Sequence, residues 1–249
     1  MVVTTNTPAS NSPARSRRTV LIVLAVVGVL LAALIGVELY ARHEATSCLS
    51  AEFEREVGSA VDVDLSAQPI LLQVLRKHYP YVGIHSDNAA FGSAVGMKLS
   101  ARAADIDLAD GTGRIGSSSA DIDWSTAGIQ QTMQQQPFGS LVSEVRAGND
   151  GTLTFAVGGL ADLVVAPSVS GGTVQVNTRS AQVLGIGLPT DLVDGVAQTI
   201  ATSLQTYPLG MTAQQIDVDT DGIHLKLAGG SYQLQSSEVD TGLVCGQRT

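Results

Sequence analysis

Hydrophobic and polar residues follow three patterns along this chain. From Val20 to Val37, eighteen consecutive residues carry no charge and no strongly polar side chain. An α-helix needs about 20 such residues to cross the hydrocarbon core of a bilayer. From Val61 onward, short runs alternate between apolar and polar residues, as strands with one buried face do, and between them apolar residues recur at helical spacing. The pattern predicts one membrane-spanning helix followed by an α+β domain.

The helical segments of this domain begin or end at residues that favour helix boundaries. Proline fits the first turn of a helix but breaks its interior, and a serine hydroxyl can cap the first turn. Pro69 and Pro189 precede two of the segments, Ser125 precedes a third, and Pro80 follows one of them. We expect helices over residues 51–57, 70–79, 126–136 and about 190–206.

Turn sequences separate the alternating runs. Glycine after Asp or Asn favours a tight hairpin because such turns need positive φ, and we expect turns at residues 110–111, 149–151, 171–172 and 220–222. A possible bulge precedes Ile106.

Only 4% of the chain is aromatic, and the strands are rich in small residues. Either the helices cover the sheet closely, or space remains between sheet and helices.

Charge around the apolar run predicts its orientation. Arg15, Arg17 and Arg18 precede it without any acid, which places the N-terminus in the cytoplasm. A cleaved signal peptide is the alternative, but the run exceeds a signal peptide's apolar region and no small-x-small cleavage site follows. We expect a disordered cytoplasmic tail (1–18), a signal-anchor helix (19–40) and an extracytoplasmic domain (41–249), in a single-pass protein of the cytoplasmic membrane whose domain lies in a periplasm-like space.

The domain is acidic. After Tyr40 there are 22 Asp and Glu against 11 Lys and Arg. Phosphate contacts need clustered cations, so nucleic acid is not an expected partner.

Two cysteines, Cys48 and Cys245, lie at the two ends of this domain. In an oxidising compartment such a pair reads as one disulfide. Closing a loop of this length is worth about 4–5 kcal/mol in the chain-entropy description. Two unrelated free thiols are the alternative.

Two motif matches have simpler explanations, and other catalytic patterns do not occur. Residues 111–116 match a dinucleotide fingerprint, but a strand follows where that motif needs a helix. Residues 217–222 match half of a calcium loop, but Ala228 occupies the position of its bidentate Glu. The four histidines are scattered and no G-x-S-x-G motif occurs. We therefore expect no enzyme activity, no catalytic residue, no metal and no cofactor.

The order of elements resembles the LmeA-like family of phospholipid-binding envelope proteins of actinobacteria. The resemblance covers nearly the whole domain through diffuse features: the early membrane or signal segment with Cys48, and the segments 61–75, 103–108, 120–123, 188–189, 207–209 and 216–225. It implies a long curved antiparallel sheet wrapped around helices, similar to half of a tubular lipid-binding domain, enclosing an apolar tunnel. It also implies binding of anionic phospholipid and a role, beside glycolipid-synthesis enzymes, in making or maintaining lipomannan-type envelope glycolipids. This chain departs from the family's pattern in one respect. Its apparent anchor is not clearly cleavable, whereas a lipid carrier that diffuses freely would be released from the membrane.

Apolar residues at buried positions are the candidate tunnel lining, with ordinary core packing as the alternative: Leu71, Val74, Leu75, Ile129, Met133, Leu153, Phe155, Val196, Ile200 and Leu204. Basic residues of this acidic domain are the candidate headgroup contacts, with plain solvation as the alternative: Arg76, Lys77, Lys98 and Arg102. A second functional hypothesis is an anchored scaffold that recruits envelope enzymes and has no lipid cavity.

Overall fold

The computed structural model describes residues 14–91, 93–108, 113–159, 161–183, 186–205 and 207–234. These residues divide between His43 and Glu44 into two compact units. Helix α1 (Ala14–Val57) begins in the first unit and ends in the second. Within its segment Leu24–Arg55, an 18-residue window with a mean hydropathy of 2.3 is long and apolar enough to cross a membrane. The expected helix over 51–57 is therefore the C-terminal end of α1.

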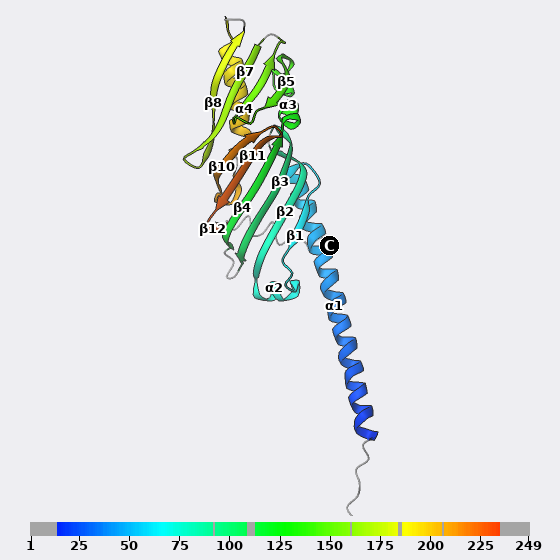
Figure 1. The fold of residues 1–249 in the computed structure, drawn as a ribbon. Helices are drawn as coiled ribbons and strands as arrows, with labels where there is room; N and C mark the ends of the chain where they lie inside the picture. Colours follow the sequence, from blue (N-terminus) through cyan, green and yellow to red (C-terminus); the bar gives the residue numbers. More distant parts are fainter. Residues whose placement is uncertain are drawn as a thin grey trace, which may run out of the picture. The chain divides into compact units, whose positions relative to one another are not determined.

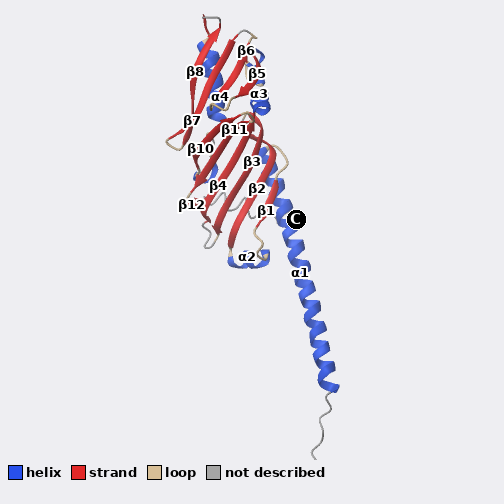
Figure 2. Ribbon diagram, in the orientation of Figure 1, coloured by secondary structure: helices blue, strands red, loops and turns tan. Residues whose placement is uncertain are grey.

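The second unit is built on two antiparallel sheets (Figures 1 and 2). Sheet A has seven strands in the order β1-β2-β3-β4-β11-β10, with β12 also paired to β4. Its strands are β1 (Asp62–Leu65), β2 (His78–Phe91), β3 (Ala94–Asp107), β4 (Gly113–Ser125), β10 (Thr212–Asp219), β11 (Gly222–Gly229) and β12 (Tyr232–Leu234). Sheet B has five strands in sequence order: β5 (Val142–Ala147), β6 (Leu153–Val157), β7 (Ala161–Ser170), β8 (Thr173–Val183) and β9 (Ile186–Gly187).

Three further α-helices accompany the sheets: α2 (Ile70–Arg76), α3 (Thr126–Gln134) and α4 (Thr190–Ser203). Two 3₁₀ turns, η2 (Gly139–Leu141) and η3 (Pro208–Gly210), precede β5 and β10. Helix α3 packs on β3 and β5, α4 packs on β7 and β8, and β10 of sheet A contacts β7 of sheet B. The α+β class with antiparallel strands is confirmed, and the structure adds that the strands form two sheets.

Most of the expected turns and caps are present. Gly151, Gly171 and Gly172 adopt positive φ in the β5–β6 and β7–β8 hairpins, and residues 220–222 connect β10 to β11. The Ser125 hydroxyl accepts a hydrogen bond from the Gly128 N–H at 3.1 Å and caps α3. The expected turn at 110–111 lies outside the described residues.

The helix expected over 70–79 is too long. Helix α2 ends at Arg76, because Lys77 adopts a left-handed conformation (φ 52°) and His78 already belongs to β2. The Leu108 N–H donates a hydrogen bond to the Lys77 carbonyl at 2.9 Å, which fixes this corner against the far end of β3. The backbone therefore leaves the helix before Pro80 could end it. The last expected helix is also shorter, since α4 ends at Ser203.

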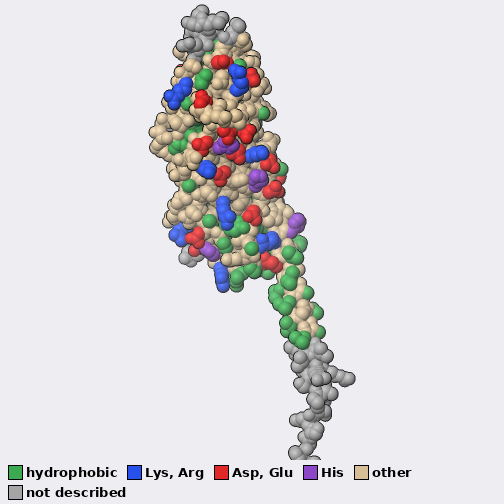
Figure 3. Space-filling model, viewed as in Figure 1, with side chains coloured by type: hydrophobic (Ala, Val, Ile, Leu, Met, Phe, Trp, Pro, Cys, Tyr) green, Lys and Arg blue, Asp and Glu red, His purple; other side chains and the backbone are tan. Residues whose placement is uncertain are grey.

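Sheet A has a polar outer face and an apolar inner face. Alternate residues such as Asp62, Asp64 and Arg102 are exposed, whereas Leu99 and Ala120 are buried on the opposite face. Figure 3 shows acidic, basic and histidine side chains mixed over sheet A. We call these two surfaces the outer and inner faces.

The bulge expected before Ile106 is absent, because β3 keeps its register with both β2 and β4 there. Asp105 adopts a positive φ of 56° between the paired residues Ala104 and Ile106. Gly116 lies opposite, where an added Cβ would come within 2.7 Å of the Asp105 Cβ. The missing side chain of Gly116 therefore makes room for the irregular Asp105.

Candidate functional site

Seven of the ten candidate lining residues meet in one core. They come from α3, β6, α4 and the residue after α4, and each is at most 1% exposed: Ile129, Met133, Leu153, Phe155, Val196, Ile200 and Leu204. The same cluster contains Trp124, whose indole N–H donates to the Val95 carbonyl at 3.0 Å. These side chains are brought together as expected, and they pack against protein neighbours. Their contact with lipid stays a prediction.

The other three candidates lie apart from this core. Leu71, Val74 and Leu75 are on α2, where their side chains are 43%, 57% and 81% exposed. Helix α2 packs on β2. These residues are surface residues of a helical corner, so any lipid that they touch would be outside the core.

The four candidate headgroup residues form two separate pairs. Arg76 and Lys77 are exposed at the end of α2. Lys98 and Arg102 are exposed on β3, on the outer face of sheet A. In the sheet register, Lys98 is the neighbour of Asp123.

A groove of about 290 Å³ opens on the outer face around Gly83. The carboxylates of Asp62 and Asp64 lie on one side of it, and on the other the Arg102 guanidinium stacks 3.5 Å from the Tyr81 ring centroid. Because Gly83 has no side chain, the groove reaches the strands themselves, and it is also lined by Val63, Ile84, His85 and Ala101. Two carboxylates beside one guanidinium make this groove unfavourable for an anionic headgroup.

Sequence reasoning missed an apolar strip on the inner face. Cross-strand pairing aligns Val63, Ile84 and Ala101 in one row and Val82 with Ala103 in the next. All five, which we call the inner strip, are only partly buried. Val63, Ile84 and Ala101 pack against the edge of the core cluster. The strip is within a few residues of α2 along β2, and period-two alternation in 61–65 and 81–85 was the signal that could have identified it.

A histidine and two carboxylates form the tightest polar cluster of the outer face. His224 Nδ1 lies 2.6 Å from Asp123 Oδ1, and Nε2 lies 3.1 Å from Asp219 Oδ2. The hydrogen bond to Asp123 raises the pKa of His224, against partial burial, which lowers it. Asp219 has a lowered pKa, because its carboxylate accepts the Asp221 N–H and interacts with His224. The calcium-loop match at 217–222 thus lies at the β10–β11 hairpin, where this cluster joins three strands.

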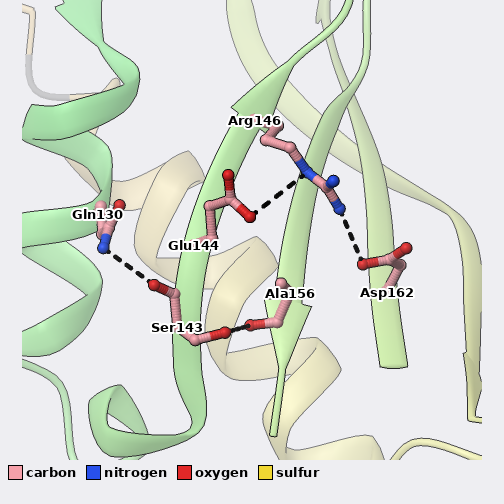
Figure 4. A network of polar contacts seen from close by, with 6 residues as sticks. All are labelled: Gln130, Ser143, Glu144, Arg146, Ala156 and Asp162. Atoms are coloured by element: carbon pink, nitrogen blue, oxygen red, sulfur yellow. Dashed lines mark hydrogen bonds and ion pairs between the residues drawn. The ribbon is translucent and has the colours of Figure 1, made fainter. Parts of the chain in front are cut away.

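Exposed polar contacts also connect α3 with sheet B (Figure 4). Gln130 Nε2 donates to the Ser143 carbonyl, and the Ser143 hydroxyl donates to the Ala156 carbonyl, both at 3.1 Å. Arg146 lies 3.3 Å from Asp162 and 3.9 Å from Glu144. These contacts are exposed to solvent. They connect α3 with β5 and connect strands of sheet B with one another.

The predicted disulfide would join Cys48 to Cys245. Cys48 lies on α1 in the second unit. Cys245 lies outside the described residues. The Cys48–Cys245 pairing therefore stays a prediction.

Comparison with known proteins identifies relatives for most of the chain. The sequence profile described as LmeA-like phospholipid-binding matches residues 32–228. Uncharacterized proteins of Mycobacterium tuberculosis and Mycobacterium bovis are 31% identical over 222 residues. The alignment covers 84% of this chain and 64% of the length of those relatives. No solved structure matches.

Proposed function

Because the chain belongs to the LmeA-like phospholipid-binding family, we propose that it binds phospholipid on the inner face of sheet A while α1 anchors it in a membrane. The inner strip is the observation that supports this site most directly. It offers five apolar side chains in two adjacent cross-strand rows, all partly exposed. Burying acyl chain against such a surface gains about 0.8 kcal/mol for each methylene removed from water.

In this proposal the site extends from the strip into the neighbouring core cluster. The inner strip continues into the cluster that holds Ile129, Met133 and Phe155. An acyl chain that entered from the strip would meet mostly apolar side chains there. In this proposal the seven buried candidates become lining residues when lipid displaces part of their packing.

The lipid is proposed to be an anionic phospholipid. Arg76 and Lys77 lie at the corner where β2 and the inner strip begin, and a cation there would lie close to a headgroup whose chains rest on the strip. Lys98 and Arg102 are on the outer face beside Asp123 and Asp64, so we give them no headgroup role in this proposal.

The cellular setting is proposed from the first unit. Its apolar helix would hold the protein in the cytoplasmic membrane with residues 1–18 inside as a tail, 19–40 across the bilayer and 41–249 outside. We further propose that the bound lipid serves the biogenesis or maintenance of lipomannan-type glycolipids, in contact with the enzymes that make them. The chain itself would act without catalysis, as a binding protein.

Photo-crosslinking tests the lipid site. The full chain is reconstituted in nanodiscs that contain phosphatidylglycerol with a photoreactive acyl chain, and crosslinked peptides are mapped by mass spectrometry. We expect crosslinks on β1–β3 peptides. The substitution Ala103→Phe fills the inner strip and should reduce them several-fold. Ser119→Phe, at an exposed outer-face position, should leave them unchanged.

Crosslinks to α1 serve as the internal reference, since bilayer lipid should label that helix equally in all three proteins. Absence of β1–β3 labelling in the unsubstituted chain would overturn the proposal. Equal labelling in Ala103→Phe would remove the inner strip as the site. A scaffold without a lipid site would instead predict no labelling of β1–β3 and a stable protein partner when native membranes are crosslinked.

A further inference from the structure

Helix α2 leaves three of its five apolar side chains exposed and buries Ile70 together with a polar residue. Leu71, Val74 and Leu75 occupy positions i, i+3 and i+4, so they form one stripe on the helix, and they are 43–81% exposed. Gln73, a polar residue, is 2% exposed, and its amide donates to the Gln68 carbonyl at 2.7 Å. A helix on the surface of a soluble domain normally has the opposite arrangement, with its apolar stripe inward. The apolar stripe of α2 is therefore left exposed by the domain's own core.

Two cations border this stripe. Arg76 and Lys77 follow Leu75 directly and are both exposed. Within the described residues, neither forms an ion pair. They are adjacent cations in a chain whose net charge is −9, and Asp107 lies across the sheet from His78, the next residue after Lys77. Apolar side chains bordered by Lys and Arg are typical of helices that lie in the interface of an anionic bilayer.

The corner is also held in a fixed conformation. The N–H groups of Leu72 and Gln73 both donate to the Pro69 carbonyl at 3.1 Å. At the other end, the Lys77 N–H donates to the Val74 carbonyl at 3.2 Å, and the Lys77 carbonyl accepts the Leu108 N–H at 2.9 Å. A fixed corner presents its exposed side chains without a further ordering cost on binding.

We propose that α2 docks on the surface of an anionic phospholipid bilayer, with Leu71, Val74 and Leu75 in the interface and Arg76 and Lys77 at the headgroups. The occupant is a bilayer because the stripe has cations beside it and because the same chain carries a helix apolar enough to span a membrane. The inference rests on the proposed function in taking phospholipid as the neighbour of the domain. It adds that the α2 corner, next to the inner strip, is the end of sheet A that meets the lipid surface.

Tryptophan placed at the corner reports the contact. The full chain with Leu75→Trp is reconstituted in nanodiscs of phosphatidylglycerol and phosphatidylcholine whose acyl chains are brominated near the headgroup end. We expect its emission to shift to shorter wavelength and to be quenched relative to unbrominated nanodiscs. The native Trp124 is buried, and its signal is measured in the unsubstituted chain and subtracted. Ser119→Trp, on the outer face, is the matched control with the same anchor and should show neither effect.

Charge dependence separates docking from nonspecific closeness to the bilayer. Arg76→Gln with Lys77→Gln, in the Leu75→Trp background, should lose most of the quenching, and so should nanodiscs of phosphatidylcholine alone. Equal quenching in Leu75→Trp and Ser119→Trp, or no quenching in Leu75→Trp with anionic nanodiscs, would overturn the proposal. Undiminished quenching after loss of both cations would overturn the role of Arg76 and Lys77. Adding Ala103→Phe to Leu75→Trp should leave the signal of the introduced indole unchanged, because that substitution fills the inner strip and not the α2 corner. Failure of the lipid site is therefore seen in the crosslinks, and failure of docking is seen in the quenching.

Discussion

At Gly128, helix α3 approaches the backbone of β3 closely. An added Cβ would lie 2.8 Å from the Gly96 carbonyl oxygen and 2.9 Å from that of Val95, both backbone atoms of β3. The side chain of Thr132, one turn later, accepts the Val95 N–H at 3.0 Å. The absence of a side chain at residue 128 thus lets α3 contact the strand backbone directly.

We predict that Gly128→Ala destabilises the protein, although alanine normally stabilises a helix interior by about 0.5–1 kcal/mol over glycine. The new methyl group has no flexible neighbour that can move, so overpacking should lower the free energy of unfolding by about 1–3 kcal/mol. Urea unfolding of the full chain in detergent, followed by Trp124 fluorescence, measures this. Gln131→Ala, on the exposed side of α3, should change it by less than about 0.5 kcal/mol. Equal stability of the two variants would contradict the close contact.

His224 makes stability depend on pH. Its pKa is raised above the usual value of 6.5, chiefly by the hydrogen bond to Asp123 and then by Asp219. A raised pKa in the folded state means that the folded protein holds the proton more tightly than the unfolded chain. The stabilisation is therefore fully present below the unfolded pKa and is lost as pH rises through the folded pKa. Because the side chain is 34% exposed, solvent limits the effect to about 1 kcal/mol or less.

We predict that His224→Gln lowers the free energy of unfolding at about pH 5.5 and has a smaller effect at about pH 8.5. Asp123→Asn removes the main cause of the raised pKa and should reduce the pH dependence in the same direction. Urea unfolding across this pH range tests both variants. A His224→Gln effect that is equal at both pH values would mean that the ion pairs with Asp123 and Asp219 do not stabilise the fold.

Among the elements, α3 begins with a side-chain cap that the local sequence supplies. The Ser125 hydroxyl satisfies the Gly128 N–H, one of the first-turn N–H groups that have no partner within the helix. We predict that Ser125→Ala costs about 1 kcal/mol of stability and speeds hydrogen exchange in the first turn of α3. Hydrogen exchange followed by mass spectrometry compares it with Ser119→Ala, an exposed serine on the same strand. Unchanged exchange in residues 126–130 would show that packing alone holds the helix end.

Local sequence signals predicted the elements whose boundaries depend on local chemistry. Examples are the Ser125 cap, the glycine turns at 151 and 171–172, and the start of α4 after Pro189. The end of α2 was not predictable in this way, since Lys77 is held in a left-handed conformation by its contact with residue 108, far along the chain. Division of the strands into two sheets likewise depends on long-range pairing, as between β4 and β11.

The candidate site was predictable only in part, for a related reason. Periodicity identifies which residues share a face, and it correctly grouped Val196 and Ile200 of α4 with Leu204 directly after the helix, where all are buried. Periodicity does not say what that face meets. Leu71, Val74 and Leu75 also have helical spacing, yet they face outward because the buried contacts of α2 are made by Ile70 and Gln73. The inner strip was overlooked because partial burial is a property of the assembled sheet.

At the scale of the whole molecule, the Cys48–Cys245 pair would tie the end of α1 to the end of the chain. We predict that peptide mapping without reduction finds these two cysteines linked. In the chain-entropy description, a closure of about 200 residues stabilises by about 4–5 kcal/mol, and measured losses for native disulfides are about 2–5 kcal/mol. Cys48→Ser with Cys245→Ser should therefore lower the free energy of unfolding by about 2–5 kcal/mol. Dithiothreitol should bring the unsubstituted chain to the same value and leave the double variant unchanged. If reduction does not alter the unfolding of the unsubstituted chain, a Cys48–Cys245 disulfide does not stabilise the domain.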